Sequence, residues 1–222
     1  MKKINGAMLK YIAIISMLID HSAVMLYGYV DFITENYSLM RNIGRLAFPI
    51  FAFLLVEGFY NTSSRNKYLK NLLIFALVSE IPYNYMIGSE IFYLPSQSIY
   101  VTLIISFVAM MFMEKTDDLF MHFLIIGLAC FAGYLIKGDY KYRGVFSILM
   151  FYMAYKEKNK LIKFGIYELA YFYEFYSIVH ISNILITFFY NGERGKQNKY
   201  FFYWFYPVHL IVLALMKNIL VG

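Results

Sequence analysis

The sequence predicts an all-α membrane protein, a polytopic bundle of about nine (8–10) transmembrane helices. Of its 222 residues, 61% are hydrophobic and 21% aromatic, while only 15% are charged. A soluble domain carries roughly 25% charged residues. Long apolar runs recur along the whole chain. Because a helix satisfies its own backbone hydrogen bonds in lipid, repeated apolar runs of this kind indicate a helical membrane bundle.

The apolar runs divide the chain into hydrophobic segments separated by short polar connections. We expect one integral membrane domain over residues 1–222. Several segments are shorter than the roughly 20 residues that a membrane crossing needs, so we expect tilted or re-entrant pieces among them. The expected segments cover roughly residues 8–28, 44–60, 68–88, 98–114, 118–136, 143–156, 160–174, 176–190 and 199–221.

The first segment, Met8–Gly28, contains three ionisable side chains, Lys10, Asp20 and His21. Lys10 lies near the start and can extend its amine to the membrane surface. Asp20 and His21 lie past the middle, where a charged group is costly unless it is paired or wetted. We therefore expect both to face protein or an aqueous cavity.

The spacing within this segment places Lys10 and His21 on one helix face. His21 follows Lys10 by 11 residues, close to three helical turns and roughly 16 Å along the axis. Asp20 points roughly 100° away from His21. A functional site is one interpretation, and a buried polar cluster that only fixes helix packing is the other.

The second and third segments also carry ionisable groups. Arg41 and Arg45 are four residues apart, which places them on one face of a helical lead-in. Glu57 follows Arg45 by 12 residues, near the opposite end of the span. Glu80 lies close to Pro82, and a proline beside an intramembrane carboxylate is typical of a cavity. A structural kink with a hydrogen-bonded glutamate explains the same pattern.

Four further residues are candidates for a functional site. Arg65 and Lys67 belong to a basic linker that we expect on the cytosolic side with Lys10, where they suit phosphate binding. Asp139 lies in a Gly-Asp turn and either points into a site or caps the next segment. His209 follows Pro207 in the last segment and is a second deep histidine, either functional or merely buried with a partner.

The distribution of charge predicts how the protein is oriented in the membrane, and the cysteine content limits disulfide and metal chemistry. Lys and Arg are concentrated in the loops that share a side with the N-terminus, which predicts a cytoplasmic N-terminus in a bacterial-type inner membrane. This bias also explains the net charge of +6 without nucleic-acid binding. The single cysteine, Cys130, excludes an internal disulfide and a cysteine metal cluster. We expect no metal, and no cleavage site for a signal peptide precedes Asp20.

Five stretches of the sequence resemble the TraX family: LKYIAIISMLIDH at 9–21, RNIGRLAFPIFAFLLVEGFYNT at 41–62, KYLKNLLIFALVSEIPYN at 67–84, GDY at 138–140 and YFFYWFYPVHLIVL at 200–213. The TraX family consists of integral membrane proteins whose namesake acetylates the N-terminus of conjugative pilin. The Lys10-x10-His21 spacing is similar to a basic-x10-His signature of a wider set of transmembrane acyltransferases. That set includes sugar O-acetyltransferases and the lysosomal heparan N-acetyltransferase.

The resemblance implies an acetyl-CoA-dependent acyltransferase that takes its co-substrate from the cytosol and modifies an acceptor on the far side. His21 would be catalytic, Lys10 its basic partner at the CoA end, and Asp20 or another carboxylate the group that orients the ring. Lys10, Arg65 and Lys67 would hold the CoA phosphates. His21 would act as a general base or accept the acyl group itself, and both options stay open. Further candidates for the cavity are Arg41, Arg45, Glu57, Glu80, Asp139 and His209.

Two other functions fit the composition. A proton-coupled transporter or flippase would use Asp20, His21, Glu57 and Glu80 as a relay across the bilayer. An assembly or chaperone subunit would use its polar residues only for structure. The acceptor is also open, because relatives within the wider set modify either peptide amines or glycans, and so is homo-oligomerisation.

Overall fold

The computed structural model describes residues 3–88, 95–172 and 178–221, and these residues form helices without a strand. The prediction of an all-α protein is therefore confirmed. The elements are α1 (Gly6–Leu26), α2 (Asp31–Glu35), α3 (Tyr37–Gly44), α4 (Ala47–Asn61), α5 (Arg65–Gly88), α6 (Ile99–Met113), α7 (Leu119–Ile136), α8 (Lys141–Ala154), α9 (Lys160–Leu169), α10 (Val179–Ile184), the π-helical turn η1 (Leu185–Phe189) and α11 (Lys199–Val221).

Each expected hydrophobic segment coincides with a helix or, for 176–190, with the pair α10 and η1. Helices α2 and most of α3 lie in a stretch that we expected to be a loop. Among the described residues, four helical stretches are long and apolar enough to cross a membrane: Gly6–Leu26, Tyr37–Asn61, Leu119–Ile136 and Tyr200–Val221. These stretches support an integral membrane protein, and the number of about nine crossings stays a prediction.

The chain divides into two compact units. Unit 1 combines Met1–Phe51 with Tyr171–Gly222, and unit 2 consists of Ala52–Ala170. The boundary between the units falls inside α4, so this helix belongs to both. The expectation of a single domain over residues 1–222 stays a prediction.

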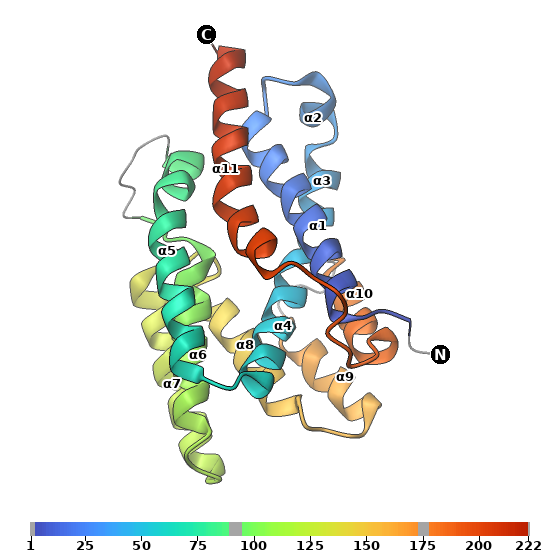
Figure 1. Cartoon of the computed structure of the whole chain (residues 1–222), viewed down its shortest axis with the longest axis vertical. Helices are drawn as coiled ribbons and strands as arrows, with labels where there is room; N and C mark the ends of the chain where they lie inside the picture. Colours follow the sequence, from blue (N-terminus) through green and yellow to red (C-terminus); the bar gives the residue numbers. More distant parts are fainter. Residues whose placement is uncertain (1–2, 89–94, 173–177, 222) are drawn as a thin grey trace. The chain divides into compact units, whose positions relative to one another are not determined.

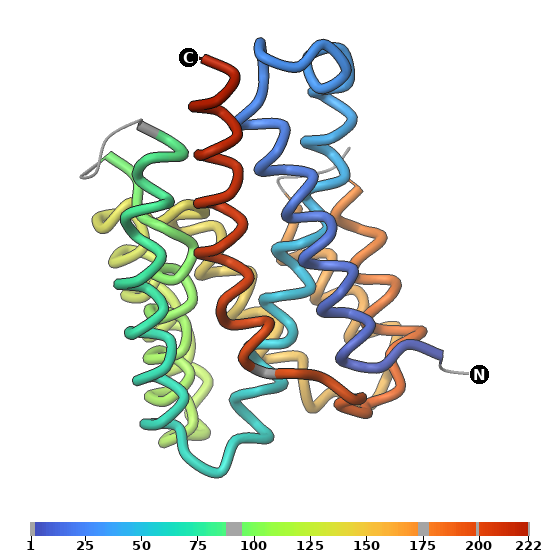
Figure 2. Tube along the Cα trace, turned by 45° about the horizontal axis from the view of Figure 1, so that its top comes forward, coloured from blue at the N-terminus to red at the C-terminus, as the bar shows by residue number. Residues whose placement is uncertain are grey.

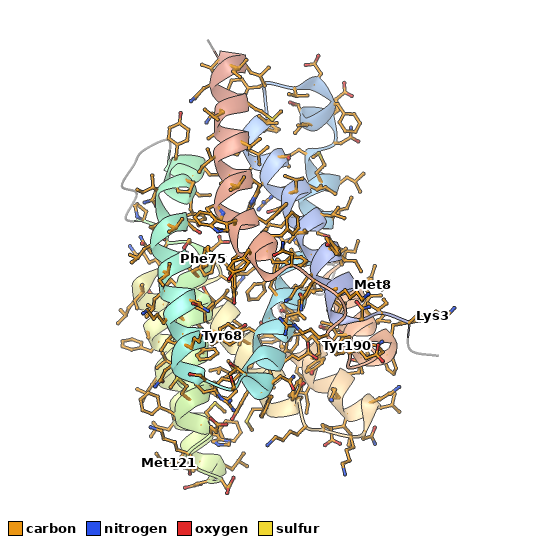
Figure 3. The ribbon with its side chains drawn as sticks, viewed as in Figure 1. Lys3, Met8, Tyr68, Phe75, Met121 and Tyr190 are labelled. Carbon is orange, nitrogen blue, oxygen red and sulfur yellow. The ribbon has the colours of Figure 1, made fainter. Side chains whose placement is uncertain are left out.

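In unit 1, α1 and α11 lie side by side and run in the same direction (Figures 1 and 2). Helix α3 packs against α1 as well. Met8 and Tyr190, labelled in Figure 3, mark the beginning of α1. There the backbone N–H of Gly6 donates to the carbonyl of Glu193 at 2.8 Å, and the N–H of Asn191 donates to the carbonyl of Ile4 at 2.9 Å. These bonds fix the start of α1 against the segment that leads into α11.

In unit 2, α5, α6, α7 and α8 pack in succession, and α9 packs on α8 (Figure 1). Tyr68, labelled on α5 in Figure 3, contacts the ring of Phe107 from α6 at 4.9 Å between centroids. The hydroxyl of Ser147 on α8 donates to the carbonyl of Ala170 at 2.9 Å. Aromatic packing and such side-chain bonds to backbone carbonyls hold the helices of this unit together.

Candidate functional site: a histidine pair between α1 and α11

The side chains of His21 and His209 meet where α1 and α11 lie together. Nδ1 of His21 is 2.7 Å from Nε2 of His209. The two rings are inclined by only 8°, with centroids 4.9 Å apart. The two nitrogens are closer than rings can approach when they stack face to face, so the imidazoles meet edge to edge through a direct N–H···N hydrogen bond.

The backbone determines which nitrogen of each ring carries the proton. Nδ1 of His209 is 2.7 Å from the carbonyl oxygen of Phe205, one turn earlier on α11. A carbonyl only accepts, so Nδ1 of His209 is the donor, and Nε2 of the neutral ring keeps a lone pair. Nδ1 of His21 must then donate to that lone pair. Assigned in this way, neutral His21 has its free lone pair on Nε2.

Aromatic rings from α11 enclose the histidine pair. Tyr206 packs edge-on against both imidazoles, with centroids 6.1 Å from His21 and 5.6 Å from His209. The ring of Phe205 lies nearly parallel to that of His209, with centroids 5.0 Å apart. His209 is buried, with 5% of its surface exposed. Because this surrounding is apolar, the hydrogen bonds of the pair are stronger than they would be in water.

Lys10 lies on the same helix as His21, near the beginning of α1. Its Nζ donates to Oε1 of Gln197 at 2.7 Å and lies over the ring of Phe202, 5.3 Å from the centroid. Since α1 is continuous from Gly6 to Leu26, the axial separation of roughly 16 Å between Lys10 and His21 holds. Gln197 was not among the expected site residues, because its contact with Lys10 spans 187 positions and leaves no local signal.

Asp20 turns away from the histidine pair and binds α3. Its Oδ2 accepts from Nη1 of Arg41 at 2.6 Å, and the positive charge of Arg45 also lies nearby. Gly44 lets α3 approach this closely, because a Cβ at that position would overlap the Asp20 carboxyl. The ring of His21 is therefore oriented by His209, while Asp20 joins α1 to α3.

The remaining expected residues lie in unit 2. Arg65 donates through Nη1 to the carbonyl of Thr62 at 2.7 Å and forms an ion pair with Glu114 at 2.8 Å through Nη2. Lys67, in the first turn of the same helix, has an exposed side chain. Glu57 on α4 lies close enough to interact electrostatically with Tyr155.

Glu80 and Asp139 both approach Tyr83. The hydroxyl of Tyr83 is 2.9 Å from that of Ser96 and also reaches the Asp139 carboxylate. Within the part of the chain that the structure describes, no group of three or more His, Cys, Asp or Glu side chains is arranged to hold a metal ion. Lys10 belongs to unit 1, and Arg65 and Lys67 belong to unit 2.

Apolar helices of membrane-spanning length around a polar histidine pair define a helical integral membrane protein. The family model described as TraX protein matches residues 5–217, so the chain belongs to the TraX family. It is also 30% identical to the "Probable fimbrial assembly protein FimC, serogroup H1" of Dichelobacter nodosus, over 96% of this chain and 95% of that protein. No solved structure matches the chain significantly.

Proposed function

We propose that this protein is a membrane acyltransferase that moves an acetyl group from acetyl-CoA to an amine or hydroxyl acceptor. The observation that carries the proposal is the series of contacts from the Phe205 carbonyl through His209 to His21. This series holds a neutral imidazole with its proton on Nδ1, leaving Nε2 of His21 ready to take a proton or to attack a carbonyl carbon.

As a general base, His21 acts on the acceptor during its attack on the thioester. Nε2 removes the proton of the acceptor N–H or O–H while the nucleophile adds to the acetyl carbonyl carbon. The C–S bond then breaks, and the sulfur of CoA leaves with the proton returned by His21. While His21 is positively charged, its Nδ1–H donates to the neutral Nε2 of His209, which stabilises the imidazolium.

As an acyl carrier, His21 attacks the thioester itself. The Nε2–acetyl bond forms as the C–S bond breaks, which leaves a positively charged acetyl-imidazole on His21 and CoA as the thiolate. The acceptor then displaces the imidazole and takes the acetyl group, and its proton passes to the thiolate or to solvent. The same proton arrangement serves both routes, because both need the lone pair on Nε2.

We propose that Lys10 binds the negatively charged part of CoA at the beginning of α1. Its separation of roughly 16 Å from His21 suits an extended pantetheine arm, with phosphates at one end and the thioester at the other. We propose Arg65 and Lys67 as further phosphate ligands. The junction of α1 and α3 is then stabilised by Asp20, Arg41 and Arg45. The remaining candidates for the lining of the substrate cavity are Glu57, Glu80, Asp139 and His209.

Family membership supports this chemistry, because the TraX family is associated with pilin acetylation. The name of the Dichelobacter nodosus relative refers to fimbrial assembly, which favours the N-terminal amine of a fibre subunit over a glycan hydroxyl as the acceptor. We place the protein as a single domain in a bacterial inner membrane with about nine crossings and a cytoplasmic N-terminus. Acetyl-CoA would then enter from the cytosol.

The direct test uses membranes that contain the protein, radiolabelled acetyl-CoA and two acceptors: a peptide with a free N-terminal amine and a neutral oligosaccharide. His21→Ala should abolish transfer while insertion into the membrane is unchanged. His122→Asn is the matched control, because Nε2 of His122 lies within hydrogen-bond distance of the carbonyls of Met113 and Thr116 in unit 2 and not of His21. Turnover of His21→Ala at the wild-type rate would refute the assignment.

A second experiment separates the two routes. Without acceptor, an acyl carrier releases a burst of one CoA per protein molecule, and His21→Ala removes the burst. A general base gives no burst under the same conditions, because the thioester stays intact until the acceptor arrives.

A non-catalytic assembly factor is the second candidate, favoured by the name of the relative. It predicts that His21→Ala supports fibre assembly as well as the wild type does. Assembly that is lost together with acetyl transfer would exclude this candidate.

A further inference from the structure

A second group of polar side chains lies in unit 2, away from the histidine pair in the sequence. It combines Glu80 from α5 with Ser98 and Thr102 from the beginning of α6, next to the loop 137–140 that connects α7 and α8. We call this group the Glu80 cluster. The transfer steps described above give this group no role, and Glu80 enters that proposal only as a candidate for the lining of the cavity.

The two carboxylate oxygens of Glu80 differ in their hydrogen bonds to the described residues. Oε2 accepts from the backbone N–H of Ser98 at 3.4 Å, at the N-terminus of α6. Oε1 is buried and has no hydrogen-bond partner among the residues that the structure describes. No basic side chain forms an ion pair with Glu80 among the residues that the structure describes. A buried carboxylate oxygen is costly in this state, so it calls for a donor or a cation.

The hydroxyl groups of Ser98 and Thr102 are also buried without a hydrogen-bond partner among the described residues. Ser98 is fully buried and Thr102 is 2% exposed, and within residues 3–88, 95–172 and 178–221 neither hydroxyl oxygen has a hydrogen-bond partner. Ser98 precedes α6 at the N-cap position without capping it through its side chain. Ser106, one turn beyond Thr102, shows the ordinary arrangement, since its hydroxyl donates to the Thr102 carbonyl at 2.8 Å. Because Ser98 and Thr102 are one turn apart, they share one face of α6.

The neighbouring loop approaches Thr102 at close range. A Cβ built on Gly138 would lie 2.8 Å from Oγ1 of Thr102, so only glycine fits there. The N–H of Gln97 donates to the carbonyl of Lys137 at 3.0 Å and holds the loop against the start of α6. Lys137 and Lys141 have positive φ angles of 59° and 49°. Non-glycine residues adopt this conformation only when the surrounding structure imposes it.

We infer that the Glu80 cluster binds a compact monovalent cation. A carboxylate oxygen and two hydroxyl oxygens are ligands that suit a hard cation such as Na⁺, and they also accept hydrogen bonds from a primary ammonium group. Either ligand would place a positive charge beside the Glu80 carboxylate and give its Oε1 a partner. The inference concerns binding alone and is independent of acetyl transfer.

The test uses the detergent-purified full chain and its thermal unfolding. The protein is titrated with NaCl or methylammonium chloride, with choline chloride keeping the ionic strength constant. Choline is too large for a compact site, so it reports the effect of salt alone. A saturable rise in Tm with Na⁺ identifies a metal ion as the ligand, and a rise with methylammonium identifies an amine. A Tm that depends on ionic strength alone overturns the inference.

Two isosteric variants locate the site. Glu80→Gln removes the charge and Thr102→Val removes a hydroxyl, and each should raise the half-saturating cation concentration by about tenfold or more. Ser106→Ala is the matched control on α6, because its hydroxyl already has a backbone partner, and it should leave that concentration unchanged. Equal half-saturating concentrations in wild type and Thr102→Val would refute the location even if Glu80→Gln failed to fold.

Discussion

The protonation pattern on which the proposed role of His21 depends is set by the carbonyl oxygen of Phe205 on α11. The Phe205 carbonyl makes Nδ1 of His209 a donor, and the resulting lone pair on Nε2 of His209 makes Nδ1 of His21 a donor in turn. The reactive nitrogen of His21 is thus selected by the other ring. This arrangement performs the orienting role that a carboxylate has in serine hydrolases.

Substitution of His209 tests this dependence. His209→Gln places an amide oxygen where Nε2 of the ring now accepts, so it should keep part of the activity. His209→Phe offers no acceptor and should lower kcat by roughly 10²-fold, with a small effect on the KM for acetyl-CoA. Steady-state kinetics with both variants measure the difference. Equal kcat values in the two variants would mean that His209 serves packing only.

The ion pair between Asp20 and Arg41 is the second prediction at the level of residues. The pair is partly buried, with 40% of the Arg41 side chain and 20% of the Asp20 side chain exposed. Asp20→Asn and Arg41→Gln should each lower the free energy of unfolding by about 1–3 kcal/mol, because each removes one charge of a partly buried ion pair. The double variant should lose less than the sum of both. Strict additivity in unfolding experiments would show that the two side chains do not interact.

At the level of elements, the junction between α1 and α3 depends on close approach. Gly44 has no side chain, and this absence leaves room for the Asp20 carboxyl. Helices that carry a glycine at their contact come closer than larger residues allow, which is a common device in membrane proteins. The pairing of Asp20 with Arg41 follows from this approach.

Gly44→Ala should therefore lower the Tm in detergent and weaken the bond between Asp20 and Arg41. Gly165→Ala on α9 is the matched control, because a Cβ there meets no atom within 4 Å. The control should be neutral or stabilising, since alanine is the better helix former by roughly 1 kcal/mol. Equal effects of the two substitutions would show that close packing at Gly44 is unimportant.

Hydropathy predicted the elements well, because every long apolar run became helical. The apolar runs did not reveal α2 and α3, because polar residues alternate with apolar ones between residues 31 and 44. They also did not reveal the partners within the site. His21 and His209 are 188 positions apart, and no periodicity along one chain encodes which two helices become neighbours. Lys10 and His21 were found together because they lie on one helix, where spacing determines the face.

At the level of the molecule, the direction of α1 and α11 constrains the membrane topology. Both helices start at the same end of unit 1 and run in parallel (Figure 2). Two parallel helices that both cross a membrane are the first and last of an odd number of crossings. Nine crossings satisfy this condition, whereas eight and ten do not.

Single cysteines test the topology. In a Cys130→Ala background, Lys3→Cys and Lys196→Cys should react with a membrane-impermeant thiol reagent from the cytoplasmic side. Val221→Cys, at the far end of α11, should react only from the opposite side. Labelling of Val221→Cys and Lys3→Cys from the same side would show that α11 does not cross the membrane.

The most direct test of the account is calorimetric titration of the detergent-purified protein with acetyl-CoA and with free CoA. We predict saturable binding that Lys10→Ala weakens by about tenfold, or 1.4 kcal/mol, while Lys217→Ala at the other end of α11 binds like the wild type. This result would place the phosphates of CoA at the beginning of α1, with the thioester extending toward His21. Absence of heat, together with absence of thermal stabilisation by either ligand, would contradict the acyltransferase and favour a proton-coupled transporter.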